Sequence, residues 1–327
     1  MVDNITIECS DVSVFSHLTD DFAKQRGCFN KIQRNHYFLT NGVPDSNEFH
    51  LRIERSRTGL KISGSIRKWY LGALSDRDLH REEFAEAMRL LADCLGIPYK
   101  NFCLFRISRI EIGICCPVAF DCSSISSMFV GFKNSSYKPL MSVGYLNFRN
   151  KSRQETIKLY DKKSEIISNM GIFKDVEELG FIKRYKDNNL IRVELTVTTK
   201  KIIRNKVHIQ SVGELVHHYH YLLCYFLKGI RQLHIAENNG ISFHPQTGSV
   251  KELTDFLQCY ALQNMGIIGE RALIEKLPPK NRKYARKKLK QLRCTAVVDS
   301  SQSADILPLL KWQAGWSFRP QKELHYN

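Results

Sequence analysis

Three segments of the chain carry acidic, basic and phenolic side chains at alternate positions, opposite a set of apolar residues. Alternate side chains of a β-strand point to opposite faces, so these groups share one face of a sheet if the three strands pair in register. Two carboxylates, a tyrosine and several basic groups on an open sheet face are suited to transesterification at phosphorus. The segments supply Arg109 and Glu111, then Lys158 and Tyr160, then Arg192, Glu194 and Thr196.

Each of these groups can be given a role in that chemistry. The oxygen of Tyr160 attacks phosphorus, while Glu111 and Glu194 hold a Mg²⁺ or Mn²⁺ ion that polarises a non-bridging oxygen. Because a free tyrosine has a pKa of about 10, the metal ion or basic neighbours must help to deprotonate it. The basic candidates are Lys158, Lys162 and Lys163 near the tyrosine, and Arg109 and Arg192 for the flanking phosphates.

The same alternation also fits a purely structural interpretation. Glu111 and Glu194 would then be exposed strand residues that pair with Arg109 and Arg192, and Tyr160 would be an aromatic side chain at the sheet edge. Cross-strand ion pairs of this kind are common. The spacing alone therefore leaves a catalytic and a structural interpretation open.

The elements that must position these groups follow from changes in periodicity. Alternation over residues 47–66 around a Ser-Arg-Thr-Gly turn predicts a β-hairpin, and helical spacing from about 76 to 95 predicts a helix that ends at Gly96. Further strands are predicted over 104–115, 141–148, 155–161 and 190–198, with a short helix from about 162. Antiparallel strands punctuated by helices predict an α+β fold with helices covering one face of the sheet.

The strand pattern ends near residue 205. Residues 212–233 and 250–265 have the spacing of helices. We therefore expect a catalytic domain over residues 1–205 and a mainly helical, basic DNA-binding domain over residues 206–327.

Composition indicates the kind of partner. The 327 residues carry a formal charge of +16, with a pI of about 9.4, which favours a polyanion: nucleic acid first, a membrane surface second. No window approaches the roughly 20 apolar residues of a spanning helix, and the amino terminus lacks a signal pattern, so a soluble, intracellular protein is expected. None of the 10 cysteines forms a CxxC pair, which favours buried free thiols over zinc or disulfides.

Basic residues are concentrated between residues 270 and 293, where Pro278 and Pro279 are expected to begin a helix with Tyr284 interleaved among the charges. This stretch fits a helix-turn-helix-like element that binds duplex DNA, and it also fits a solvated basic face. The residues selected for DNA contact are Arg282, Lys283, Arg286 and Lys287.

Three histidines lie together on the first predicted helix of the carboxyl-terminal half. A pair at positions i and i+3 can bind a metal ion, but no acidic partner stands nearby in the sequence. Packed or surface histidines are the favoured interpretation of His217, His218 and His220.

Three phrases of the chain resemble the gene II/X replication initiators of filamentous phages and related plasmid proteins. They are Arg106–Gly113, Thr156–Glu165 and Ile191–Leu195, in the order and approximate separation of that family, and the hairpin segment Ser63–Lys68 is similar too. The resemblance covers about residues 45 to 200. It implies that Tyr160 is the nucleophile that nicks the plus strand at the origin, and it adds Lys68 to the DNA-binding candidates.

The chain departs from the wider rolling-circle endonucleases at the metal site. Those enzymes bind the metal through a histidine-hydrophobe-histidine strand, whereas Arg109-Ile110-Glu111 occupies the comparable strand here. Glu111 is therefore the first choice of ligand. His50, on the polar side of its own strand, is either a further ligand or an exposed histidine.

The resemblance implies a cytoplasmic protein of a bacterial host cell that acts on double-stranded origin DNA and on single-stranded DNA. Nicking would leave a 5′-phosphotyrosine and a 3′ hydroxyl for the host polymerase, and rejoining would need no ATP. The chain has no phosphate-binding loop of the Gly-x-x-x-x-Gly-Lys-Ser/Thr type, so unwinding would fall to a host helicase. Three alternatives remain: a plasmid relaxase or transposase with the same chemistry, a non-catalytic DNA-binding repressor, and a metal-only nuclease.

Overall fold

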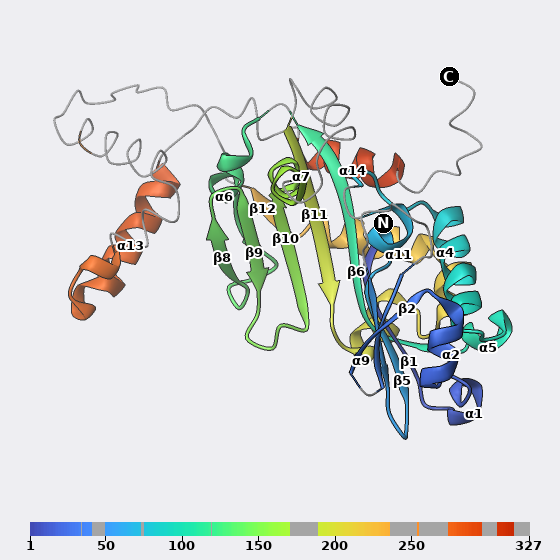
Figure 1. The fold of residues 1–327 in the computed structure, drawn as a ribbon. Helices are drawn as coiled ribbons and strands as arrows, with labels where there is room; N and C mark the ends of the chain where they lie inside the picture. Colours follow the sequence, from blue (N-terminus) through green and yellow to red (C-terminus); the bar gives the residue numbers. More distant parts are fainter. Residues whose placement is uncertain are drawn as a thin grey trace, which may run out of the picture.

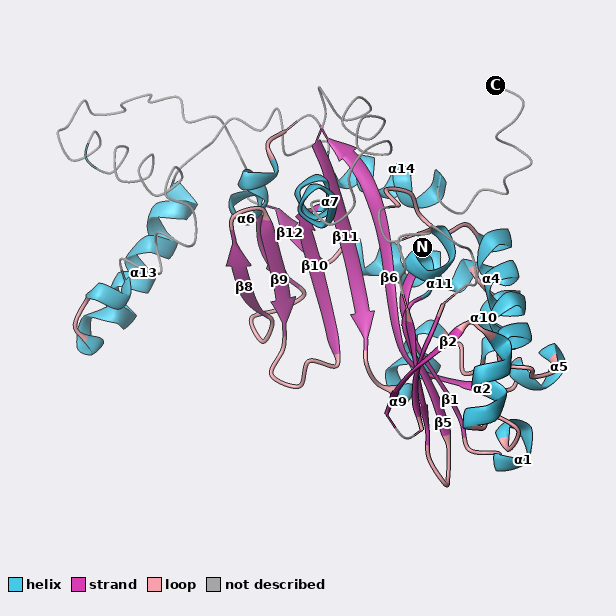
Figure 2. Cartoon of the chain, viewed as in Figure 1, coloured by secondary structure: helices cyan, strands magenta, loops and turns pink. Residues whose placement is uncertain are grey.

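A ten-stranded antiparallel sheet forms the centre of the protein, in the order β2-β3-β4-β5-β1-β6-β11-β10-β9-β8 (Figures 1 and 2). A second, two-stranded sheet pairs β12 with β7. The computed structural model describes residues 1–33, 35–40, 50–72, 75–118, 120–170, 189–235, 254, 274–295 and 306–316. Among these residues, no helix is both long enough and apolar enough to cross a bilayer.

The strands are mostly short, except for the long strand at the middle of the sheet. They are β1 Val2–Cys9, β2 Phe29–Gln33, β3 His36–Leu39, β4 Leu51–Arg55, β5 Leu60–Ser65, β6 Arg106–Val118, β7 Phe129–Phe132, β8 Lys138–Ser142, β9 Tyr145–Arg149, β10 Glu155–Asp161, β11 Asn189–Val197 and β12 Leu233–Ile235.

The helices fall into three groups along the chain. Those of the amino-terminal half are α1 Val12–Phe15, α2 Asp20–Arg26, α3 Ile66–Leu71, α4 Arg81–Cys94 and α5 Tyr99–Phe102. The middle of the chain has the turn η1 Cys122–Ser124, α6 Ile125–Met128, α7 Lys162–Met170, α9 Lys200–Ile202 and the π-turn η2 Ile203–Val207. The last group is α10 Val212–His217, α11 His220–Ile230, α13 Pro279–Thr295 and α14 Ile306–Trp316.

One face of the sheet is apolar and is covered by helices. Alternate residues of β6 and β11, such as Ile112 and Val193, are fully buried and belong to the same core as residues of α4, α11 and α14. Helix α11 approaches β11 so closely that a Cβ on Gly229 would lie 2.8 Å from Leu195 Cδ2. The prediction of an α+β fold with a large antiparallel sheet is confirmed, although α3 and α7 lie against the polar face beside the apolar-face cover.

Several predicted elements shift at their ends. The hairpin forms as β4 and β5, and the strand predicted over 104–115 forms as β6, which begins at Arg106 and continues to Val118. The segment 141–148 is not a single strand, because it turns at Gly144, which has a φ of +64°, and divides between β8 and β9. The helix expected over 212–233 breaks into α10 and α11 and ends in β12, while the helix expected over 250–265 lies outside the described residues except Thr254.

The expected domain boundary at residue 205 falls inside the packed core. Leu215, Leu222 and Phe226, all after the boundary, are 0% exposed and share one core with the sheet residues. The reason is that the apolar face of the sheet needs a cover and α10 and α11 provide part of it. Residues 206–235 thus belong with the sheet. Helix α13 is not part of this cover and lies beside β8 at the edge of the sheet (Figure 1), where Arg286 and Lys138 line a shared pocket.

This arrangement predicts that Phe226→Ala destabilises the sheet and the helical cover together. Emptying a fully buried phenylalanine site should lower the free energy of unfolding by about 3–5 kcal/mol, within one transition followed in urea by circular dichroism and fluorescence. The matched control is Val143→Ala, at a side chain that is 83% exposed, which should change stability by less than about 0.5 kcal/mol. Separate transitions for the two probes would contradict a shared core.

Candidate active site

Strand register brings the predicted groups to one face of the sheet. Lys158 lies opposite Glu194, and Thr196 lies opposite Glu111, so β10, β11 and β6 present one continuous polar patch. Tyr160 lies opposite Arg192 in the same patch. These side chains therefore lie on one face of the sheet, as the alternation predicted.

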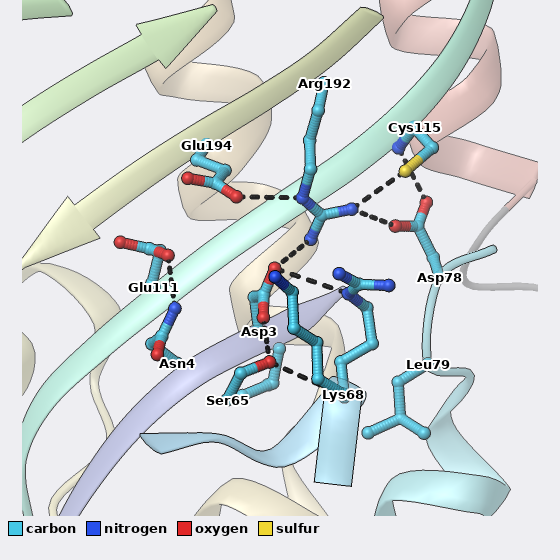
Figure 3. Close-up of polar contacts among 12 residues, drawn as sticks. Asp3, Asn4, Ser65, Lys68, Asp78, Leu79, Glu111, Cys115, Arg192 and Glu194 are labelled. Atoms are coloured by element: carbon cyan, nitrogen blue, oxygen red, sulfur yellow. Dashed lines mark hydrogen bonds and ion pairs between the residues drawn. The ribbon is translucent and has the colours of Figure 1, made fainter. Parts of the chain in front are cut away.

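Arg192 is fully buried and holds the patch together (Figure 3). Its guanidinium donates to Glu194 Oε1 at 2.8 Å and to Asp3 Oδ2 at 2.7 Å. The Nη1 group of Arg192 donates to Asp78 Oδ1 at 3.0 Å and to Cys115 Sγ at 2.9 Å. Because Arg192 is fully buried, it cannot reach a DNA phosphate, and the expectation that it contacts DNA is wrong. Its role in this structure is to position the carboxylates.

Asp3 was not selected from the sequence, yet it is one of three carboxylates that converge here. The ligand oxygens of Asp3, Glu111 and Glu194 lie within 4.8 Å of one another, and all three side chains are buried. Burial raises the pKa of Asp3, but the charges of Arg67 and Arg192 outweigh it and hold that pKa well below its usual value. Asp3 is therefore an anion in the folded protein.

A register shift in β1 explains why Asp3 escaped sequence analysis. The shift between Val2 and Ile5 interrupts the alternation, so that two consecutive residues point to the polar face. Asp3 accepts from Ser65 and the arginines there, while Asn4 Nδ2 donates to Glu111 Oε1 at 2.7 Å. In the sequence, the one sign of this arrangement is that the polar pair Asp3-Asn4 lies between the apolar residues Val2 and Ile5.

Lys158 places its ammonium between two of the carboxylates. Its Nζ lies 3.0 Å from Glu111 Oε2 and 3.1 Å from Glu194 Oε2. Burial lowers the pKa of Lys158, but the charges of Glu194 and Glu111 outweigh it and raise that pKa above its usual value. Lys158 thus remains charged and occupies a position suited to a cation.

The three carboxylates also fit a divalent metal ion. An all-oxygen set of donors suits Mg²⁺ or Mn²⁺. Each carboxylate already accepts hydrogen bonds from protein groups, and Lys158 would have to move for an ion to bind between Glu111 and Glu194. His50, the further ligand considered from the sequence, instead stacks on Phe38 with ring centroids 5.3 Å apart and is not part of the carboxylate group.

Tyr160 donates its hydroxyl hydrogen to Glu194 Oε1 at 2.9 Å. Burial, followed by the charge of Glu194, raises the pKa of Tyr160 well above its usual value. Burial and the charge of Glu111 also raise the pKa of Glu194. The phenol is therefore neutral at rest, and the carboxylate best placed to take its proton is Glu194.

Helices α3 and α7 form the wall of the pocket beside the tyrosine. Lys68, on α3, contacts Glu165 Oε1 of α7 at 3.0 Å, and buried Lys162 pairs with the other oxygen of Glu165. Burial is the largest effect lowering the pKa of Lys162, followed by the charges of Arg67 and Arg192. The pocket has a volume of about 540 Å³, and Glu111, Glu194, Lys158, Tyr160, Tyr145 and Lys68 are among its lining residues.

Two basic residues selected from the sequence differ in how close they lie to this pocket. Arg109 Nη2 is 3.6 Å from Glu111 Oε2, and its side chain is 47% exposed, so it stands at the rim of the carboxylate group. Lys163 is not among the residues that line the pocket. Lys162 does not line the pocket either, and it reaches the site through its ion pair with Glu165. Of the three lysines selected from the sequence, Lys158 is the one that lies beside the tyrosine, because both side chains contact Glu194.

Helix α13 carries the basic residues selected for duplex binding. Lys283, Arg286 and Lys287 are exposed, and the Tyr284 side chain is 73% exposed. Arg282 is different, because its guanidinium donates to the carbonyls of Leu277 and Glu275 at 2.9 Å each. Arg282 therefore holds the turn that precedes the helix.

The histidine and cysteine residues that the structure describes form no metal group. His218 stacks on Tyr221 with ring centroids 5.0 Å apart, and His217 and His220 pack beside these rings. The eight cysteines whose side chains the structure describes are free thiols. Only Cys115, Cys116 and Cys122 are buried, so the expectation of buried thiols holds for these three.

Comparisons with known proteins find similarity among solved structures. No family model and no curated protein matches the chain. Among solved structures, it is similar to a rolling circle replication initiator protein from Geobacillus stearothermophilus, with a TM-score of 0.37 and 13% identity over 79% of this chain and 95% of that one. At that score the likeness assigns neither a fold family nor an activity to this chain.

Replacing Lys158 by methionine should strengthen the binding of Mn²⁺. The change removes the ammonium between Glu111 and Glu194 but keeps an unbranched side chain, so two buried carboxylates lose their competing cation. We expect the dissociation constant to fall by roughly tenfold or more, measured by electron paramagnetic resonance titration without DNA. Lys163→Met, outside the pocket, is the control. Equal Mn²⁺ binding in the two variants would contradict a cation site for which Lys158 competes with the metal ion.

Proposed function

We propose that the protein initiates rolling-circle DNA replication by nicking the origin plus strand through Tyr160 and later rejoining it. The observation that carries the proposal is the contact between the Tyr160 hydroxyl and Glu194, within a pocket that also holds Lys158 and Glu111. A nucleophile, a base in hydrogen-bond contact and cationic groups together are the requirements of phosphoryl transfer.

In this mechanism the residues of the chain divide the work. The Tyr160 oxygen forms a bond to phosphorus as its proton passes to Glu194, and the bond from phosphorus to the 3′ oxygen breaks. The 3′ oxygen takes up a proton from water and leaves as a hydroxyl, while the 5′ phosphate stays on the tyrosine. Lys158, kept charged by its carboxylate neighbours, stabilises the negative charge on the phosphoryl oxygens. Rejoining reverses these steps.

A divalent ion held by Asp3, Glu111 and Glu194 would supply Lewis-acid polarisation of a phosphoryl oxygen. Glu194 would then help to hold the ion while it still accepts the hydrogen bond from Tyr160. Arg192 keeps Glu194 in the required orientation.

The biological setting rests on the motifs that resemble gene II/X initiators. They support an enzyme of a phage or plasmid that acts in the cytoplasm of a bacterial host, on double-stranded origin DNA and the single strand released from it. A host helicase and polymerase complete the reaction in this proposal. The exposed basic groups of α13 and the net charge of +16 support binding of duplex DNA.

The covalent step is tested with supercoiled DNA that carries the element's own origin, in Mg²⁺ or Mn²⁺, followed by denaturing detection of protein-linked DNA. The wild type should form an adduct, and Tyr160→Phe should abolish it because the attacking oxygen is gone. Tyr145→Phe is the matched control, since Tyr145 lies opposite Tyr160 and lines the same pocket. Nicking without an adduct would identify a nuclease that uses water, and an inverted result would make Tyr145 the nucleophile.

Duplex binding is tested on α13. Replacing Lys283, Arg286 and Lys287 by alanine should weaken binding to origin duplex in gel-shift assays. The slope of log K against the logarithm of the salt concentration should become shallower by about 0.9 for each phosphate that the helix no longer binds. The control changes three basic surface residues of α2, α4 and α5 to alanine, namely Lys24, Arg89 and Lys100. This control removes the same positive charge from another surface. If both triple variants bind duplex DNA equally weakly, α13 contributes only to the net charge of the protein and is not a specific DNA-binding element.

A further inference from the structure

A row of side chains crosses the polar face of the sheet and ends at the candidate site. Each member lies directly opposite the next on the neighbouring strand, from β3 through β4, β5 and β1 to β6. We call this set the polar-face row: Phe38, Arg52, Ser63, Thr6 and Arg109. Because adjacent strands are about 4.8 Å apart, the row spans roughly 19 Å. Its last member, Arg109, contacts Glu111 of the site.

The composition of the row is unusual for a sheet surface. Phe38 is 38% exposed although the apolar face of the same sheet is available, and it stacks on His50 with an interplanar angle of 25°. The side chains of Arg52 and Arg109 are 52% and 47% exposed. Between these arginines stand the short side chains of Ser63 and Thr6. An aromatic platform and two guanidinium groups therefore face solvent along one line.

The neighbouring surface adds to the positive charge. A pocket of about 420 Å³ lies beside the row, between β1, β3, β4, β5 and β6, and it is lined by four basic and two acidic side chains. Glu54 contacts both Arg52 at 2.8 Å and Lys61 at 3.3 Å, and Glu8 contacts Lys200 at 2.6 Å. Arg52 thus shares one carboxylate with a second cation. The basic excess that remains is complementary to a phosphate backbone.

We infer that the polar-face row binds an unpaired DNA strand and leads it to the scissile phosphate. Bases stack on Phe38 and His50, while Arg52 and Arg109 contact successive phosphates. Stacking on a side chain requires a base face that is free, which a duplex interior does not offer, so the row selects single-stranded over duplex DNA. This inference rests on the proposed function, because it makes the row the entry path to Tyr160.

The test separates binding from chemistry. A Tyr160→Phe protein is mixed with fluorescein-labelled oligothymidine in the presence of EDTA, and the fluorescence anisotropy is compared with that for a labelled duplex hairpin. In this background Phe38→Leu should weaken oligothymidine binding roughly tenfold, whereas Phe38→Tyr, which keeps the ring, should bind as before. Arg52→Ala should also weaken it, and Arg89→Ala, an exposed arginine on α4, should not.

The outcomes distinguish this inference from the proposed function. If Phe38→Leu and Arg52→Ala bind oligothymidine as the parent does, the row is not a strand-binding site, even if wild type forms the tyrosine adduct. Loss of hairpin binding in place of oligothymidine binding also overturns it. If the two variants lose oligothymidine binding while wild type forms no adduct, the row stands and the nicking proposal fails. Thermal unfolding of each variant must match the parent, and Phe38→Tyr guards against a folding defect.

Discussion

The buried guanidinium of Arg192 is the interaction on which the rest of the site depends. It joins Asp3 of β1, Asp78 before α4 and Glu194 of β11 through hydrogen bonds of 2.7–3.0 Å. Three buried carboxylates without this cation would repel one another at low local dielectric, and breaking a buried pair by removing one partner costs about 3–5 kcal/mol. The same contact orients Glu194 toward Tyr160, so stability and chemistry rest on one side chain.

Antiparallel pairing extends that constraint across the sheet. Opposite residues on adjacent strands share a face, so neighbouring strands line up their side chains in rows on the polar face, while the other face of the sheet contributes to the core. Strand β6 is long enough to carry both Glu111 in the site and Arg109 in the polar-face row. The distance between a bound strand and the tyrosine is thereby set by backbone hydrogen bonds, with no flexible loop between them.

Local periodicity predicted much of this arrangement and failed where pairing is non-local. The alternation around Glu111, Tyr160 and Glu194 predicted their shared face, because a period of two is a property of each strand. No spacing shows that residues 2–9 pair between β5 and β6, or that a register shift turns Asp3 inward. Arg192 was expected to meet DNA because alternation gives the face of a side chain and not what covers it. In this protein Asp3 and Asp78 cover the Arg192 side chain.

Charge balance links the cation to the substrate. Four carboxylates (Asp3, Asp78, Glu111 and Glu194) contact four basic groups (Arg67, Arg109, Lys158 and Arg192), so the site is close to neutral by itself. Adding a divalent ion to a neutral buried cluster is unfavourable, and so is adding a phosphate alone. Adding both restores the balance, particularly if Lys158 turns from the carboxylates toward the phosphate. Metal ion and DNA should therefore each raise the affinity of the site for the other, because binding free energies are reciprocal.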